Sequence, residues 1–198
     1  MRASQWPSNF KFNISTDPGD PTDGFAFLLQ NSLGGAAALG AAGQGLGYVG
    51  LTPSVAIVFR GRGPVVIGAV TGGIDLADLL PIPFQPPGFY TDPTEGQFYN
   101  KDEYAWIDYN PVGNSLSVFL STTNVKPGAA LMTTTVDVFG TLGSQTYVGF
   151  SAGNGGAFGN QDIMSWQFNA AAVPEPAAAG MLALGLAVLG LARRRNAR

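Results

Sequence analysis

The 198-residue chain contains no cysteine and no histidine. Without cysteine it forms no disulfide bond and has no thiolate chemistry. Without histidine it lacks the most frequent general base, the Ser-His-Asp triad and the common histidine zinc sites. These two absences exclude several of the most common catalytic centres before any motif is considered.

Charge is also scarce, since only 12% of the residues are charged. Residues 1–173 hold twelve acidic and six basic side chains, a net charge of −6, whereas residues 174–198 have a net charge of +3. An acidic region without a basic stripe is poorly suited to the phosphate backbone of nucleic acids, so we expect no nucleic-acid partner. The length of residues 1–173 predicts a single domain.

Helical periodicity is rare in the first 169 residues. Apolar and polar residues alternate there in short runs bounded by Gly, Pro, Asn and Asp, a pattern typical of half-buried strands joined by turns. The expected strands cover 10–14, 25–29, 55–59, 65–70, 104–109, 115–121, 134–139, 146–151 and 163–168. One short helical pattern, 74–80, stops at Pro81. Many strands without intervening helices predict an all-β antiparallel sandwich or barrel over residues 1–169.

The C-terminal residues form a separate region. A linker at 170–176 leads to an uncharged apolar run of 16 residues at 177–192 and a basic end at 193–198. A helix of this length covers about 24 Å, slightly less than a hydrocarbon core of about 30 Å. Because the run is apolar on all sides, we expect a transmembrane helix rather than a buried core helix. The basic residues after it are Arg193, Arg194, Arg195 and Arg198. Arginines stay on the cytoplasmic side, so residues before Pro174 are expected outside the membrane.

This region resembles the PEP-CTERM sorting signal of Gram-negative bacteria. The resemblance rests on Val173, Pro174, Glu175 and Pro176, followed in order by the apolar run and the arginines. It implies export, transient anchoring in the inner membrane and processing by an exosortase near the Pro-Glu-Pro motif. Delivery to the cell surface or the extracellular matrix would follow. The signal is an address and does not specify what the exported domain does.

Two glycine-rich segments, 34–50 and 153–159, interrupt the predicted strands. Glycine permits positive φ angles and lets backbone N–H groups come close to a ligand. Composition alone favours a flexible surface connection over a binding loop. Neither segment has the Gly-Lys-Ser/Thr ending of a phosphate-binding loop or opens a helix, so we expect no nucleotide site.

The ordered set of segments resembles an L-type, legume-like lectin domain. Its front half matches in 22–31, in the glycine-rich loop that ends at Tyr48, and in 54–57. Its closing strands match in 105–110, 115–121, 147–152 and 163–168. The resemblance implies a concanavalin A-like jelly roll of two antiparallel sheets, with a polysaccharide or other glycan bound by loops at one end.

The sugar site of this family carries over to three short segments. The matching residues are Asp23, Gly24, Gly43, Gln44, Gly45, Asn154, Gly155 and Gly156. The resemblance implies that the aspartate accepts hydrogen bonds from two sugar hydroxyls, often after a cis peptide bond. The second segment would donate a backbone N–H to the sugar, and the third would set specificity. Taken alone, an aspartate before a glycine is more typical of a turn.

The metal ligands of the family do not carry over. The strand matching 55–59 normally supplies glutamate and aspartate in a Val-Glu-Phe-Asp pattern, but the corresponding residues here are Val58 and Arg60. A hard cation needs several oxygen ligands and is repelled by arginine. The metal-binding histidine is missing too, and the loop that normally follows is replaced by 61–88. We therefore expect no calcium or transition-metal site and no cofactor.

Two other functions compete with sugar binding. Related sandwiches include glucanases, whose retaining mechanism needs two carboxyl groups about 5–5.5 Å apart at alternate strand positions. None of Glu95, Glu103 and Glu175 has a carboxylate two residues away in such a strand, and Asp102 beside Glu103 would face the opposite side. We therefore expect no enzyme. The stronger alternative is a structural protein of the extracellular matrix that keeps the lectin fold without binding sugar.

The N-terminal residues lack an expected export signal. Residues 1–7 contain no apolar stretch of the 7–15 residues that a signal peptide requires. The lectin resemblance starts near Phe10, whereas the family has earlier strands, one of which lies beside the strand that contains Trp166. We therefore expect an upstream reading frame encoding a signal peptide and roughly 40–70 further residues. Without them, the strand at Trp166 is expected to lie at an open sheet edge.

Overall fold

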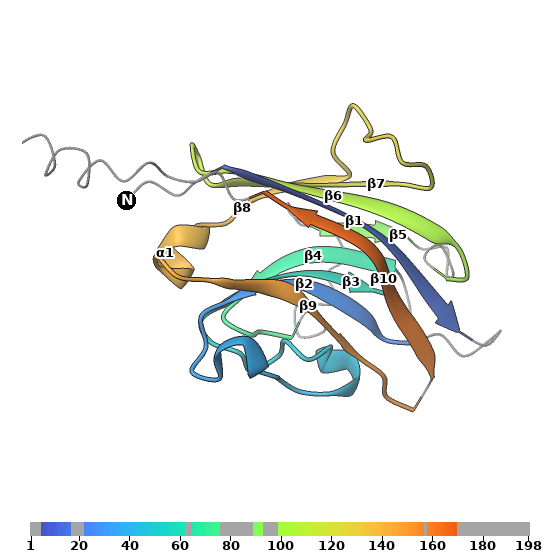
Figure 1. Cartoon of the computed structure of the whole chain (residues 1–198), viewed down its shortest axis with the longest axis horizontal. Helices are drawn as coiled ribbons and strands as arrows, with labels where there is room; N and C mark the ends of the chain where they lie inside the picture. The colour runs from blue at the N-terminus through green and yellow to red at the C-terminus, as the bar shows by residue number, and fades with distance from the viewer. Residues whose placement is uncertain are drawn as a thin grey trace, which may run out of the picture.

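The computed structural model describes residues 5–16, 22–61, 65–75, 89–92, 99–156 and 158–169. Within these residues, ten strands form two five-stranded antiparallel sheets that pack face to face (Figure 1). Sheet A has the order β10-β1-β6-β7-β8 and sheet B the order β5-β4-β3-β2-β9. The all-β antiparallel sandwich predicted from the sequence is confirmed.

The strands of sheet A come from both ends of the described chain. They are β1 (Trp6–Thr16), β6 (Asp102–Asn110), β7 (Ser115–Ser121), β8 (Met132–Thr135) and β10 (Gly159–Phe168). Sheet B contains β2 (Gly24–Gln30), β3 (Ser54–Arg60), β4 (Val65–Thr71), β5 (Phe89–Asp92) and β9 (Tyr147–Gly153). Because β9 and β10 follow each other in the chain but belong to different sheets, their connection joins the two layers at one side of the sandwich.

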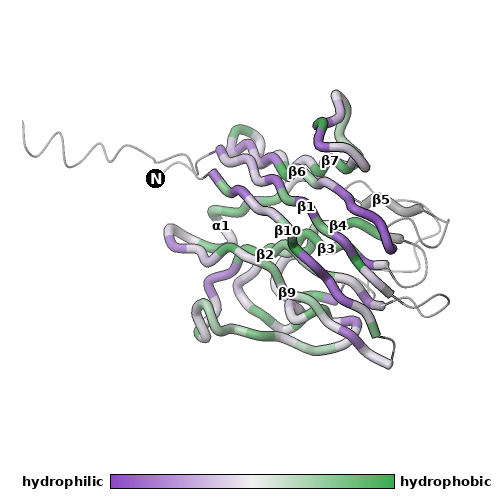
Figure 2. The backbone as a smooth tube through the Cα atoms, turned by 45° about the vertical axis from the view of Figure 1, so that its right-hand side comes forward, coloured by the Kyte–Doolittle hydropathy of each residue, from purple (hydrophilic) through white to green (hydrophobic). Residues whose placement is uncertain are grey.

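The main core fills the space between the two sheets. Residues of β6 alternate between buried and partly exposed, and hydrophobic and hydrophilic residues alternate along sheet A in Figure 2. Aromatic rings dominate this core, with Phe25 and Phe59 stacked at a centroid distance of 4.8 Å and Phe10 packed edge-on against both. Burying one such ring contributes about 1.5–3 kcal/mol of stability, so this cluster is the main force that holds the sheets together.

A second apolar layer lies on the other face of sheet B. Alternate residues of β2 and β3, such as Leu28 and Val58, point away from the main core and pack against the glycine-rich segment 34–50. That segment contains the 3-10 turns η1 (Gly35–Ala37) and η2 (Gly43–Gly45), and its Leu46 and Tyr48 side chains are buried. The segment is therefore a packed third layer, and the expected flexible surface connection is wrong. The apolar residues within this glycine-rich segment, such as Leu46 and Tyr48, could have indicated from the sequence that it packs against the sheet.

Most predicted strands are observed, but the one at 134–139 is wrong. Strand β8 ends at Thr135, and Val138–Leu142 forms the short helix α1. The Asp137 side chain caps this helix by accepting a hydrogen bond from Gly140 N at 2.8 Å. The alternation of apolar residues did not reveal that Asp137 caps a helix. Its side chain gives the Gly140 N–H an acceptor other than a neighbouring strand, so strand pairing ends here.

Several predictions concern residues outside the described ranges. They include most of the helical pattern at 74–80, the Pro-Glu-Pro motif with Val173, the apolar run 177–192 and the four C-terminal arginines. Within the described residues, no helix has the length and apolar character needed to cross a membrane. The transmembrane helix and the boundaries of the linker and basic tail therefore remain predictions.

Candidate binding site

Asp23 lies at the start of β2, at one end of sheet B. Gly24 follows it with a φ angle of 123°, and a Cβ at that position would lie 2.1 Å from the carbonyl oxygen of Phe59. Only glycine fits this close approach. The Asp23 carbonyl accepts a hydrogen bond from Gly61 N at 3.1 Å, and the residue as a whole is 2% exposed. The Asp-Gly pair therefore holds the aspartate in one fixed position.

Thr22, the preceding residue, is held from three sides. Its carbonyl accepts a hydrogen bond from the Tyr99 hydroxyl at 2.9 Å. Its side-chain oxygen accepts one from Gln161 Nε2 at 2.9 Å and donates one to Asn154 Oδ1. The peptide bond between Thr22 and Asp23 is trans, because the one cis bond among the described residues precedes Pro53. The cis geometry expected from the family resemblance is absent here, and these hydrogen bonds orient the aspartate instead.

Two glycines border the Asp23 carboxylate. A Cβ on Gly155 would lie 3.1 Å from Asp23 Oδ2, and one on Gly43 would lie 4.0 Å from the same oxygen. Gly43 has a positive φ angle of 60° and opens the η2 turn, whose backbone packs against Gly153 of β9. Three separate segments of the chain therefore meet at one carboxylate, whose Oδ2 is buried beside the two glycines.

The other predicted site residues divide into two groups. Three of them are exposed and lie next to Gly43 or Gly155 in the chain, namely Gln44, Asn154 and Gly156. Gly45, in contrast, is buried against Ala41 and Val49. Gly45 therefore packs the loop internally. The side-chain amide of Asn154 is already engaged, because its Oδ1 accepts from Gln161 Nε2 at 2.7 Å and its Nδ2 donates to the Gly159 carbonyl at 2.8 Å. These bonds fix the loop after β9.

Sequence reasoning missed Gln161 and Tyr99, which both support the Asp23 segment. Gln161 lies on β10 in sheet A and bridges Thr22 and Asn154, and Tyr99 lies just before β6. No local motif marks either residue. Their roles arise because sheet A and sheet B come together at this end of the sandwich.

In the lectin family that this chain resembles, the strand corresponding to β3 carries the metal ligands. Val58 is fully buried in the second apolar layer, and Arg60 ends the strand opposite Gly24. Among the described residues, no three acidic side chains gather closely enough to hold a metal ion. The donor set in this part of the chain therefore does not fit a calcium or transition-metal ion.

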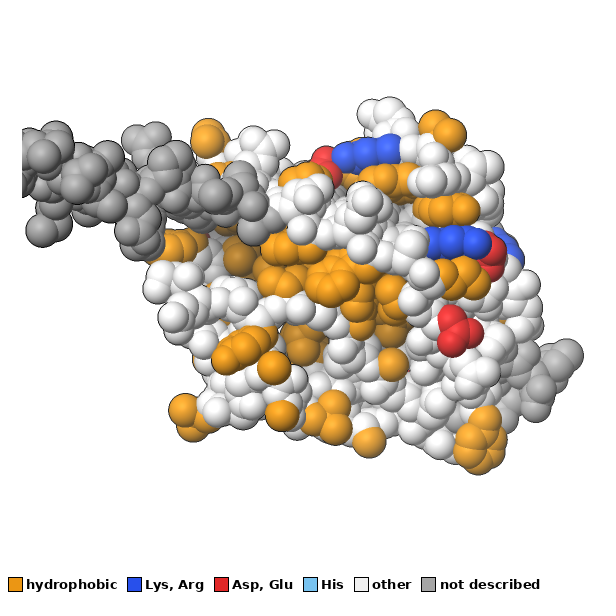
Figure 3. All heavy atoms as spheres, in the orientation of Figure 1, with side chains coloured by type: hydrophobic (Ala, Val, Ile, Leu, Met, Phe, Trp, Pro, Cys, Tyr) orange, Lys and Arg blue, Asp and Glu red, His pale blue; other side chains and the backbone are white. Residues whose placement is uncertain are grey.

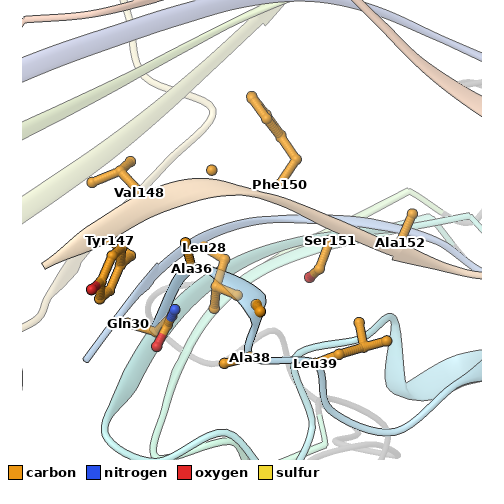
Figure 4. A pocket seen from close by; sticks show the side chains of 12 residues that line it. Leu28, Gln30, Ala36, Ala38, Leu39, Tyr147, Val148, Phe150, Ser151 and Ala152 are labelled. Atoms are coloured by element: carbon orange, nitrogen blue, oxygen red, sulfur yellow. The ribbon is translucent and has the colours of Figure 1, made fainter. Parts of the chain in front are cut away.

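A groove of about 510 Å³ runs along the outside of β9 (Figure 4). Leu28 and Leu39 line it, and Val148 and Phe150 point from β9 toward the sandwich interior. The Ser151 hydroxyl oxygen is buried in this region and has no hydrogen-bond partner among the described residues. The groove therefore offers apolar surface and one buried hydroxyl oxygen without a partner among the described residues.

Of the carboxylates considered for catalysis, Asp102 and Glu103 lie among the described residues, and these two do not form a pair. Asp102 lies on the outer face of sheet A, where Lys11 Nζ contacts it at 2.5 Å. Glu103 is buried at 3% exposure, and its nearest charge is Lys101 Nζ at 3.1 Å. Burial raises the pKa of Glu103, with Lys101 opposing that shift. The expected placement of these neighbours on opposite faces is confirmed.

Two antiparallel sheets packed face to face form a β-sandwich like that of legume lectins. Residues 94–182 match the legume lectin domain family, and residues 172–196 match the PEP-CTERM protein-sorting motif. The chain is thus a PEP-CTERM sorting-motif protein with a legume-lectin-like domain. Lectin domains of this family are typically not enzymes.

Solved lectins share the fold. Lectin II from Ulex europaeus matches with a TM-score of 0.64 at 21% identity, over 84% of this chain and 72% of the lectin. The Bauhinia forficata lectin in complex with GalNAc matches with a TM-score of 0.64 at 18% identity, over 87% of this chain and 75% of the lectin. At these identities the similarity establishes the fold alone.

A curated relative comes from a plant. The probable inactive L-type lectin-domain containing receptor kinase III.1 of Arabidopsis thaliana is 26% identical over 82% of this chain. The aligned region is 28% of that protein, so the chain spans little more than a quarter of its length. The similarity therefore concerns a lectin-domain-sized segment of a much longer protein.

Proposed function

We propose that this protein is an exported lectin that binds a glycan through Asp23 without a bound metal ion. The observation that carries the proposal is the convergence of Asp23, Gly43 and Gly155. A carboxylate accepts strong hydrogen bonds from hydroxyl groups, and glycine borders let a sugar ring come close to it.

Fixed geometry supports binding without a metal brace. In this chain, Tyr99 and Gly61 donate hydrogen bonds to the carbonyls of Thr22 and Asp23, and Gln161 donates one to the Thr22 hydroxyl. A site that is oriented before the ligand arrives loses less entropy on binding. We propose that this hydrogen-bonded frame replaces the role that a metal would have.

Galactose-type sugars are the first ligands to test. Two of the structural neighbours are a lectin of the UEA-II type complexed with galactose and the Bauhinia lectin complexed with GalNAc. The full-length chain, purified in detergent, would be applied to a glycan array that includes both sugars, with calcium and with a chelator. Equal, specific retention under both conditions supports the proposal. A blank array from folded protein contradicts it.

A structural matrix protein is the second candidate. The observation that favours it is the 2% exposure of Asp23, which leaves little of the residue in contact with solvent. This candidate predicts a blank array together with retention of the folded protein in the extracellular matrix. The array and a localisation experiment therefore separate the two candidates.

The sorting motif implies export and exosortase-mediated surface sorting. We propose that residues 177–192 anchor the chain transiently in the inner membrane, with residues 1–169 outside, the linker 170–176 cut near Pro174-Glu175-Pro176, and residues 193–198 in the cytoplasm. Glu175→Ala with Pro176→Ala would then keep the protein in the membrane fraction. Release of this variant at the rate of the unchanged protein would contradict the proposal.

A further inference from the structure

The outer face of sheet A carries aromatic side chains on adjacent strands. Tyr104 and Trp106 of β6 both face outward and are partly exposed, and the residues between and around them alternate inward. Across β1, Lys11 lies opposite Tyr104 and Asn9 lies opposite Trp106. A sheet face exposed to water normally presents small polar or charged side chains, so two aromatic rings in this place require an explanation.

The two rings lie roughly parallel to each other. Their centroids are 6.3 Å apart, and their planes differ by 22°. They line a hollow of about 300 Å³, together with the amide side chains of Asn9, Gln167 and Asn124. Asn124 comes from the connection between β7 and β8, which rises above sheet A in Figure 1. The hollow is thus lined by aromatic and amide residues, and we call it the sheet A platform.

The charges around the sheet A platform are already paired. Lys11 contacts Asp102 at 2.5 Å, and its Nζ lies 5.7 Å from the centre of the Tyr104 ring. Lys126 forms an ion pair with Asp108 and covers the ring of Phe119 at 4.2 Å. Basic and acidic side chains accordingly lie side by side on this part of the surface (Figure 3). The platform therefore favours an uncharged ligand over an anionic one.

We propose that the sheet A platform is a second binding site, which takes a neutral oligosaccharide. A pyranose ring has an apolar C–H face that stacks on an aromatic ring, and a rim of hydroxyls that amide groups can donate to and accept from. Tyr104 and Trp106 line the hollow and offer such a stacking surface. The site lies on sheet A, whereas Asp23 precedes β2 of sheet B, so the inference does not depend on the proposed function.

Titration of the full-length chain in detergent with neutral hexasaccharides tests this site. The probes are β-1,4-linked hexamers of glucose, mannose and galactose, and the readouts are calorimetry and tryptophan fluorescence. We expect Trp106→Ala and Tyr104→Ala each to weaken binding of at least one hexamer by about tenfold or more. Trp106→Phe, which keeps an aromatic face, should retain most of the affinity.

Two control variants keep the result specific. Tyr147→Ala removes an exposed aromatic of sheet B and should bind the hexamers as the unchanged protein does. Asp23→Ala separates the two sites, because it removes any binding at the Asp23 site, and the loss caused by Trp106→Ala should persist in the Asp23→Ala background. Near-ultraviolet circular dichroism shows whether each variant is folded.

Three outcomes would overturn the inference. The first is no binding of any hexamer by the folded protein, and the second is equal binding by Trp106→Ala and the unchanged protein. The third is an oligomer that dissociates on Trp106→Ala while hexamer affinity does not change, which would identify the face as a protein interface.

Discussion

A methyl group on the α-carbon of Gly155 would lie 3.1 Å from Oδ2 of Asp23, although the two residues are 132 positions apart in the sequence. The contact joins the loop after β9 to the start of β2. Any side chain larger than that of glycine at position 155 would therefore come against the Asp23 carboxylate. The contact also supplies a way to close the site without removing its carboxylate.

Gly155→Val is expected to abolish sugar binding at the Asp23 site. The added side chain would occupy the space above the carboxylate, while the exposed position should change the free energy of unfolding by less than about 0.5 kcal/mol. Gly156→Val is the matched control, because a Cβ there meets no atom within 4 Å. Glycan binding and melting temperature measure both effects. Equal binding by the two variants would contradict this site.

Asp23→Ala is expected to weaken sugar affinity by about ten- to a hundredfold. The loss corresponds to about 1.5–3 kcal/mol for a hydrogen bond to a charged group. The backbone hydrogen bonds that hold residues 22 and 23 do not involve the aspartate carboxylate, so the fold should persist. Isothermal calorimetry with the sugar found on the array measures the change. An unchanged affinity would remove Asp23 from the site.

Gly24→Ala is expected to destabilise the protein by more than about 1 kcal/mol. The new Cβ would meet the Phe59 carbonyl oxygen at 2.1 Å, in a backbone conformation with a φ angle of 123°. Chemical denaturation measures the free energy of unfolding, and Gly128→Ala, at an open position, is the control. A Gly24→Ala variant as stable as the control would show that β2 and β3 separate easily here.

The unchanged protein should lose stability as the pH rises, and Glu103→Gln is expected to abolish this loss. Burial raises the pKa of Glu103 in the folded state, so the folded protein holds this proton more tightly than the unfolded chain. Stability therefore falls as the pH rises from the ordinary glutamate pKa through the raised one. Melting temperatures measured across this range should fall less steeply for the variant.

Asp102→Asn is the contrasting variant for this pH experiment. The hydrogen bond from Lys11 lowers the pKa of Asp102, so its contribution is present above the ordinary aspartate pKa and is lost as the pH falls. The two substitutions should change the pH profile in opposite directions. Parallel profiles would contradict the assignment of burial as the cause at Glu103.

Calcium is expected to leave the melting temperature unchanged. A ligand that binds only the folded state stabilises it by mass action, and Val58 and Arg60 occupy the strand positions at which the family carries acidic ligands. Differential scanning fluorimetry with calcium and with a chelator makes the comparison. A rise of several degrees with calcium would overturn the prediction of a metal-free site.

The sequence by itself determined the all-β class, most strand positions and the sorting motif. Alternation of apolar residues is a local property, and the burial of every second residue in β6 follows from it directly. The edge position of β10 was also expected, and among the described residues this strand pairs only with β1. The expected upstream segment remains a prediction.

Only the tertiary structure decided how the site and the surfaces are built. It placed Gly155 and Gly43 at the Asp23 carboxylate, buried Gly45 and assigned Gln161 a supporting role. It also turned Tyr104 and Trp106 outward onto one platform. The Gly155 contact joins residues 132 positions apart and the Gly43 contact residues 20 positions apart, and the outward direction of the two rings depends on which sheet face is buried. No local pattern encodes them, because the pairing of strands and the packing of the two sheets fix these distances.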